Sequence, residues 1–306
     1  MDDKRIYNGI MRIRIIATLV IVAYHCACPY HYWNWKGYLA DSQRVAINVD
    51  FIFLKLLCNT MLPAFFMISG FLFYSRKEHY CDLKATLWKK FDRLIIPFAI
   101  ITAVCVSLNL PMIGVASASG HLWFIRELFL FFCIALLLYR VKEHWIMGLG
   151  IVSYGLYVLQ SRLGFTTDEV TGQFLMYFIF FIGGYYMALY YNRIRENRIR
   201  YAVLLLWIAA LAAGIQSVYT ILFNIVLIGF IPCTSIKNKF MLSVNQYSFG
   251  IYLLHHVVIF AVFPLPMLQY LYAHHALLAI TLMFMIALSA SWIMCIGLKK
   301  IGFKYF

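Results

Sequence analysis

A histidine stands inside an apolar segment near the N-terminus, and an arginine precedes it on the same side of the predicted helix. His25 follows Arg14 by eleven residues in the segment RIRIIATLVIVAYHCAC. Eleven residues are close to three helical turns, or about 16 Å, so the two side chains point to one side. An ionisable group inside a membrane span is costly and is a functional candidate. A neutral His25 can take a proton from a hydroxyl group; the alternative is a hydrogen bond to a neighbouring helix.

A carboxylate that can orient this imidazole lies in the segment HLWFIRELFLFF. Glu127 is roughly 9 Å below the outer end of its predicted span, and His25 is roughly 20 Å above the inner end of its own. In a core about 30 Å thick these depths nearly coincide. We therefore predict that Glu127 orients His25, as the carboxylate does in a catalytic triad. The alternative is that Glu127 and Arg126 pair with other helices and serve stability.

Arg126 and Trp123 stand in the same segment. Neighbouring helix residues point about 100° apart, so Arg126 is not expected to pair simply with Glu127. That leaves Arg126 to bind an oxyanion or the acceptor. Trp123 and His121 lie at the predicted outer interface, where aromatic side chains are common; we assign Trp123 to this belt, with a substrate contact as the alternative.

A polar stripe crosses the apolar segment NQYSFGIYLLHHVV. Ser248, Tyr252 and His255 fall at i, i+4 and i+7, which places them on one face of a helix. Such a stripe faces protein or a cavity in preference to lipid, and we predict that one of the three stabilises an oxyanion. His256 points elsewhere and receives no role.

Two further pairs of residues have a binding and a structural interpretation. Lys90 and Arg93 are three residues apart on a probable helix in the segment WKKFDRLIIPF, so they share a face. They either anchor the helix at the membrane surface or bind phosphates, with Arg14 as a further cation. Ser69 and Gly70, in FFMISGF, either allow close helix packing or leave a narrow passage for the chain of a ligand.

The composition of the chain indicates which kind of secondary structure positions these residues. The 306 residues are 64% hydrophobic and 12% charged, with a mean hydropathy of +0.81, whereas a soluble domain carries about 25% charged residues. The apolar residues come in continuous blocks, which disfavours a β-barrel. We predict an all-α, polytopic transmembrane helical bundle that forms a single membrane-embedded domain over residues 1–306. The ten predicted spans are 11–29, 56–74, 94–112, 122–140, 145–161, 173–191, 201–217, 219–233, 246–264 and 276–298.

The formal net charge of +14 is explained by topology. With a cytoplasmic N-terminus, 21 of the 26 Lys and Arg residues lie on the cytoplasmic side. The positive-inside rule then places both termini in the cytoplasm, and the anionic membrane lipids become the partner of the basic residues. Nucleic acid is excluded as a partner on the same ground. The eight cysteines include no CxxC pair, so they are interpreted as small buried hydrophobic residues, and no metal is expected.

Together the motifs resemble the acyltransferase-3 family of membrane O-acyltransferases. The resemblance rests on Arg14-x10-His25, FFMISGF, Lys90-x-x-Arg93, HLWFI and YSFGIYLLH, which occur in family order. It implies an enzyme of a bacterial cytoplasmic (inner) membrane that takes an acetyl group from cytosolic acetyl-CoA. The acceptor is a hydroxyl of an envelope glycan or a lipid-linked sugar. It also implies His25 as the catalytic histidine, Arg14 as its companion, and Lys90 and Arg93 as residues that bind the acyl donor.

Two positions depart from the family pattern. Met11 occupies a position where the family often has an aspartate, and Lys90 replaces an arginine, which keeps the charge but loses the bidentate phosphate contact. In the expected mechanism, the pantetheine arm of acetyl-CoA passes Ser69 and Gly70 to reach His25. Because the family also includes glycan exporters, the alternative function is a transporter or flippase of an envelope glycan precursor. A second alternative is a sensor or scaffold subunit, whose function would not be lost when His25 is replaced.

Overall fold

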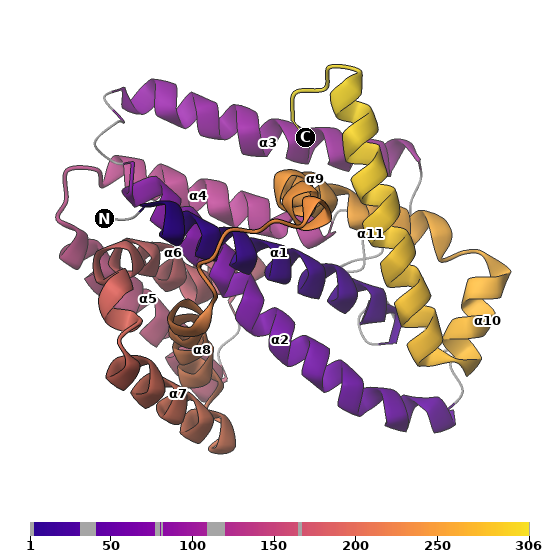
Figure 1. The fold of residues 1–306 in the computed structure, drawn as a ribbon, viewed down its shortest axis with the longest axis horizontal. Coiled ribbons are helices and arrows are strands. Elements are labelled where there is room, and N and C mark those ends of the chain that lie inside the picture. Colours follow the sequence, from indigo (N-terminus) through magenta and orange to yellow (C-terminus); the bar gives the residue numbers. More distant parts are fainter. Residues whose placement is uncertain are drawn as a thin grey trace. The chain divides into compact units, whose positions relative to one another are not determined.

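Helices are the only regular elements in the part of the chain that the structure describes. In this computed structural model the described residues are 3–30, 41–76, 80, 82–108, 120–164 and 167–305, without the side chains of 3, 41–55 and 161. The α-helices are α1 (Asp3–Ala27), α2 (Asp41–Tyr74), α3 (Leu83–Ser107), α4 (Trp123–Leu137), α5 (Glu143–Leu163), α6 (Glu169–Ile194), α7 (Asn197–Ala212), α8 (Gln216–Phe230), α9 (Lys239–Val262), α10 (Pro266–His274) and α11 (Ala276–Lys300) (Figure 1). Two 3₁₀ helices, η1 (Cys28–Tyr30) and η5 (Gly120–Leu122), follow α1 and precede α4. The all-α prediction is confirmed for these residues.

The ten predicted spans all fall on helices, but fewer helices are long and apolar enough to cross a membrane. Among the described residues five qualify: Lys4–Tyr30, Leu56–Tyr74, Gly120–Leu137, Glu169–Ile194 and Ala276–Lys300. The pair α9 and α10, bent by 95° at a short break, would be a sixth. Helices α7 and α8 have 16 and 15 residues, or roughly 23 Å, which is shorter than a core about 30 Å thick. The count of ten and the side on which the termini lie therefore stay predictions.

The surface of several helices is apolar, as a lipid environment requires. Side chains more than half exposed include Leu205 and Leu206 on α7 and Leu277, Met285 and Ile293 on α11. Long exposed apolar side chains on several helices are what a lipid environment favours. Sequence analysis did not predict α10, which begins with Pro266 at a position where proline is well tolerated. The end of the predicted third span, residues 109–112, lies outside the described residues.

The chain divides into two compact units, and the division falls inside α1, α2 and α3 and near the start of α4. Unit 1 comprises Met1–Ile13, Asn59–Asp92 and Ile125–Ser235, and unit 2 comprises Arg14–Cys58, Arg93–Phe124 and Ile236–Phe306. Within unit 1, α5 packs against α6, and α7 packs against α8 (Figure 1). Its core gathers Ile6 and Ile10 of α1, Met67 and Phe71 of α2, and Ile228 of α8.

A pair of glycines brings α2 and α6 into backbone contact within unit 1. A Cβ added to Gly70 would collide with the carbonyl of Phe181, and one added to Gly184 would collide with backbone atoms of Met67 and Phe71. Gly70 is therefore explained by close helix packing, which is one of the two interpretations from sequence. Ser69, beside it, is half-buried.

Unit 2 holds the end of α1 against the C-terminal helices. The Tyr272 hydroxyl of α10 donates to the carbonyl of Cys26 at 2.8 Å, and the Tyr30 hydroxyl donates to the carbonyl of Tyr272 at 2.8 Å. Trp292 of α11 donates to the Ser243 hydroxyl of α9 at 2.8 Å. The first two bonds hold the backbone one residue beyond His25 to α10, and the third holds α11 to α9.

Two neighbouring glycines of α6 offer a matched test of the α2–α6 contact. We expect Gly184→Ala to destabilise the protein by about 1–3 kcal/mol, because its Cβ meets backbone atoms that cannot move independently. Gly183→Ala has open space for its Cβ and should be neutral or slightly stabilising. Thermal unfolding in detergent measures the difference. Equal stability of the two variants would show that the helices do not pack as described.

Candidate functional site

Four histidines meet in unit 2, and they come from three separate segments of the chain. His25 lies on α1, His121 on η5, and His255 and His256 on α9. The ring centroid of His25 is 4.9 Å from that of His255 and 4.2 Å from that of His256. The rings of His121 and His256 are 4.0 Å apart. We call these four residues the histidine cluster.

The cluster is largely shielded from solvent. His121, His255 and His256 are 5%, 0% and 3% exposed, whereas His25 is half-buried. His25 is therefore the least buried residue of the cluster.

A chain of two hydrogen bonds determines where His25 carries its proton. Nδ1 of His255 lies 3.0 Å from the carbonyl oxygen of Ile251, and a carbonyl only accepts, so this Nδ1 carries the hydrogen. In the neutral ring Nε2 of His255 is then the acceptor, and it lies 2.8 Å from Nδ1 of His25. His25 therefore donates from Nδ1, and its lone pair is on Nε2. That atom has the electronic form a general base needs.

This geometry gives His25 a partner that we did not predict. Its Nδ1 is bonded to His255, and the prediction that Glu127 orients the imidazole stays a prediction. His255 was predicted to stabilise an oxyanion, and both of its ring nitrogens are occupied by orienting contacts. It is a positioning residue for His25.

The other predicted oxyanion donors also have acceptors. Nε2 of His121 donates to the carbonyl of Tyr252 at 3.0 Å, and the Tyr252 hydroxyl donates to the carbonyl of His121. A phenol has a single proton to donate, so this reciprocal pair commits it. The Ser248 hydroxyl donates to the carbonyl of Asn245 at 3.0 Å. The predicted stripe is buried as expected, and the hydroxyl groups of Ser248 and Tyr252 donate to backbone carbonyls.

Sequence analysis missed His121 and His256. We expected His256 to point away from the site and His121 to lie at an outer interface. Every residue of α9 from Gly250 to Phe260 is buried, so both sides of this helix face protein. The signal that indicates this is the run GIYLLHHVVIF, which is apolar all round and therefore typical of a buried helix.

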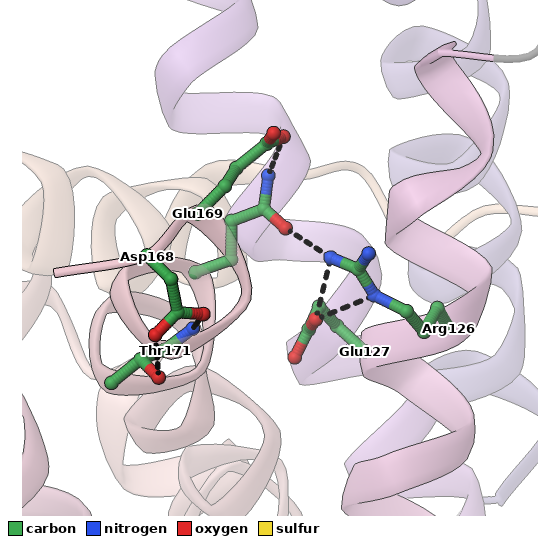
Figure 2. Close-up of polar contacts among 6 residues, drawn as sticks. Arg126, Glu127, Asp168, Glu169 and Thr171 are labelled. Carbon is green, nitrogen blue, oxygen red and sulfur yellow. Dashed lines mark hydrogen bonds and ion pairs between the residues drawn. The ribbon is translucent and has the colours of Figure 1, made fainter.

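Glu127 and Arg126 pair in unit 1, and the expectation that they do not was wrong (Figure 2). The guanidinium donates from Nε and Nη2 to Oε1 of Glu127, each at 3.1 Å. Although the two Cα–Cβ bonds diverge, the long arginine side chain turns back to the carboxylate. Nη2 of Arg126 also donates to Oε1 of Gln173 at 2.8 Å. The side-chain amide of Gln173 in turn donates to the carboxylate of Glu169 at 2.8 Å. These bonds use Nε and Nη2 of Arg126, and its role toward an oxyanion or the acceptor stays a prediction.

One oxygen of Glu127 remains available. The residue is 0% exposed, and its Oε2 has no hydrogen-bond partner among the residues that the structure describes. A buried carboxylate oxygen without a donor is costly, so it is a position where a ligand hydroxyl would be stabilising. The helix that carries Gln173 starts nearby, where Asp168 accepts from the backbone and hydroxyl of Thr171 (Figure 2). These bonds hold the pKa of Asp168 below its usual value.

The basic residues predicted to bind the donor lie on α1 and α3. In unit 2 the guanidinium of Arg14 lies close enough to Arg93 for electrostatic repulsion. Within the described ranges, no acidic side chain is ion-paired with either of them. Two cations that repel each other at one place favour an anionic ligand. In unit 1 the ammonium of Lys90 lies over the ring of Phe132, 4.1 Å from its centroid.

The remaining predicted residue, Trp123, is the first residue of α4 and is half-buried. Its ring centroid lies 6.5 Å from that of Phe124. This position tests neither a belt role nor a substrate contact, and both stay predictions.

Comparison with known proteins gives one match. The acyltransferase-3 family model, described as an acyltransferase domain, matches residues 7–296. No curated protein and no solved structure matches the chain. The matched range contains every residue of the histidine cluster, together with Arg14, Arg93 and Glu127.

The hydrogen-bond chain makes a prediction about tautomers. We expect ¹⁵N spectra of histidine-labelled protein to show His25 and His255 protonated at Nδ1, and His121 protonated at Nε2. His255→Leu removes the acceptor, so the proton of His25 should move toward Nε2. His144→Gln, at an exposed histidine outside the cluster, should only delete its own signals. An Nε2-protonated His25 in the unmodified protein would contradict the hydrogen-bond chain.

Proposed function

Because this chain belongs to the acyltransferase-3 family of membrane acyltransferases, we propose that it transfers an acetyl group from acetyl-CoA to a hydroxyl of an envelope glycan or lipid-linked sugar. The observation that carries the proposal is the lone pair on Nε2 of His25, set by its bond to His255. A base of this kind is what the attack of a hydroxyl on a thioester needs. We further propose that the enzyme lies in a bacterial cytoplasmic membrane with both termini in the cytoplasm.

The proposed reaction uses His25 twice. Nε2 of His25 accepts the proton of the acceptor hydroxyl while the oxygen attacks the thioester carbonyl of acetyl-CoA. The tetrahedral intermediate then breaks its carbon–sulfur bond, and His25 returns the proton to the leaving CoA sulfur. The products are the acetyl ester and CoA. His255 holds the imidazole throughout and accepts its Nδ1–H when His25 is transiently cationic.

The donor is proposed to bind through its phosphates at Arg14 and Arg93, with Lys90 as a third cation. The mutual repulsion of the two guanidinium groups supports this assignment, because a polyphosphate relieves it. Lys90 can exchange its cation–π contact with Phe132 for a phosphate, since such a contact contributes about 0.5–2 kcal/mol. The pantetheine arm is long and thin, which suits a route from a basic mouth to a buried base.

Glu127 is proposed to bind the acceptor. Arg126 holds Oε1, and Oε2 is the atom that remains for a sugar hydroxyl. In this role Glu127 binds the substrate, whereas His255 orients His25. It also accounts for a buried carboxylate in a segment where such groups are costly.

Acetyl transfer by purified protein in liposomes tests the proposed function. With labelled acetyl-CoA and envelope glycan from a deletion strain, we expect an acetyl ester and one equivalent of CoA. His25→Gln should lower the rate by about 10²–10⁴-fold, because the general base is lost. His255→Gln should retain more activity than His255→Leu, because an amide oxygen can still accept from Nδ1 of His25. A glycan that is moved across the membrane without consumption of acetyl-CoA would replace the proposal with a transporter.

A double variant in the same assay separates the two roles considered for Glu127. If Glu127 binds the acceptor, the losses in kcat/KM from Glu127→Gln and His255→Leu should multiply, because the two residues act independently. If Glu127 helps to orient His25, the double variant should lose clearly less than that product.

Donor affinity tests the basic residues. We expect Arg14→Gln and Arg93→Gln each to weaken CoA binding by about 1.5–3 kcal/mol, or roughly 10–150-fold, because each removes a charge-assisted hydrogen bond. Arg198→Gln is the control, since it removes the same charge from an exposed position on α7. Calorimetric titration with CoA gives the affinities. Unchanged binding in both variants would assign these residues to membrane anchoring.

A further inference from the structure

Three members of the histidine cluster are arranged so that one metal ion can bind them. His25, His255 and His256 each offer one ring nitrogen, and these three atoms lie within 4.8 Å of one another. We propose that the cluster binds a divalent transition-metal ion, with Zn²⁺ the best fit, and that the bound ion inhibits acyl transfer. The inhibitory part rests on the proposed function, whereas the site itself does not. Sequence analysis expected no metal, because the cluster unites three segments that have no motif in common.

The distances suit a tetrahedral zinc ion after small side-chain movements. Zinc binds imidazole nitrogen at about 2.0–2.1 Å, which places neighbouring ligand atoms about 3.3 Å apart. Nδ1 of His25 and Nε2 of His255 are 2.8 Å apart and need to separate by roughly half an ångström. A ring nitrogen of His256, whose ring stands at 90° to that of His25, lies within 4.8 Å of the other two ligand atoms and must turn toward the ion and move closer. Three protein ligands leave the fourth position for water or substrate.

The chemistry of the ligands selects the ion. Neutral imidazoles suit zinc, copper and nickel, whereas magnesium and calcium require oxygen ligands. His255 already has the outer contact typical of a metal-bound histidine, because its Nδ1–H is held by the carbonyl of Ile251 and Nε2 faces the cluster. The burial of His255 and His256 shields the site from competing water.

Metal binding and base catalysis exclude each other at His25. When the ion replaces the proton between His25 and His255, the His25 ring stays neutral and its hydrogen moves from Nδ1 to Nε2. Nε2 then carries a hydrogen and has no lone pair for the acceptor hydroxyl. One ion therefore converts the general base into a donor without any change in the fold. Removal of the ion restores the original tautomer.

Cobalt reports occupancy directly. Metal-free protein in detergent should bind one equivalent of Co²⁺, with the visible absorption of a tetrahedral Co²⁺ site, and Zn²⁺ should displace it. His256→Gln should weaken Co²⁺ binding at least 10-fold, while His144→Gln should leave it unchanged. The wild-type protein supplies a test that needs no variant: Zn²⁺ should move the ¹⁵N-detected proton of His25 from Nδ1 to Nε2. Absence of the Co²⁺ absorption, or equal binding by His256→Gln, would overturn the site.

The transfer assay tests the inhibition separately. Zn²⁺ should stop CoA release by the wild-type protein, a chelator should restore it, and His256→Gln should need at least 10-fold more Zn²⁺ for the same effect. Metal binding that leaves transfer unchanged or raises it would overturn the inhibitory role. If metal-free protein transfers no acetyl group at all, the proposed function fails, and the Co²⁺ titration still decides the site.

Discussion

The carbonyl oxygen of Ile251 is the constraint on which the candidate site depends. In an α-helix this oxygen accepts the backbone N–H four residues later, which is that of His255. Its second lone pair takes the Nδ1–H of the same residue, at 3.0 Å. One backbone atom thereby fixes the orientation and tautomer of His255, and through it the tautomer of His25. A shift of α9 relative to α1 would break this chain. The bonds of Tyr272 and Tyr30 hold the end of α1 to α10, the helix that follows α9.

The use of a histidine in place of a carboxylate to orient the base has an energetic consequence. A carboxylate stabilises the imidazolium that forms during proton transfer by its charge, whereas His255 offers only the dipole of a lone pair. The cost of a cationic His25 is therefore higher than in a triad with a carboxylate. In return, the resting cluster needs no buried anion, which a membrane-spanning segment accommodates at considerable cost. Glu127, the buried acid of unit 1, has Arg126 beside it to offset that cost.

The features that were predicted correctly from sequence share one property, namely that the signal is local. Apolar runs located the helices, and a stripe at i, i+4 and i+7 indicated a buried face at Ser248, Tyr252 and His255. Partners on other helices could not be derived in this way, because equal depth in the membrane does not determine which side chains face each other. Nothing in the sequence indicated that His255 bonds to His25, and the prediction that Glu127 orients His25 stays a prediction. His121 and His256 were missed for the same reason, since only the packing of α9 on all sides brings them to His25.

A resting site built from neutral rings also has an electrical consequence for a membrane protein. A full charge moved across the membrane changes in energy by about 2.3 kcal/mol per 100 mV. The chain from His25 through His255 to Ile251 carries no formal charge in the tautomers that its hydrogen bonds define. A voltage across the membrane therefore exerts no net force on these neutral rings, so the orientation of His25 does not depend on a fixed charge moving in that field.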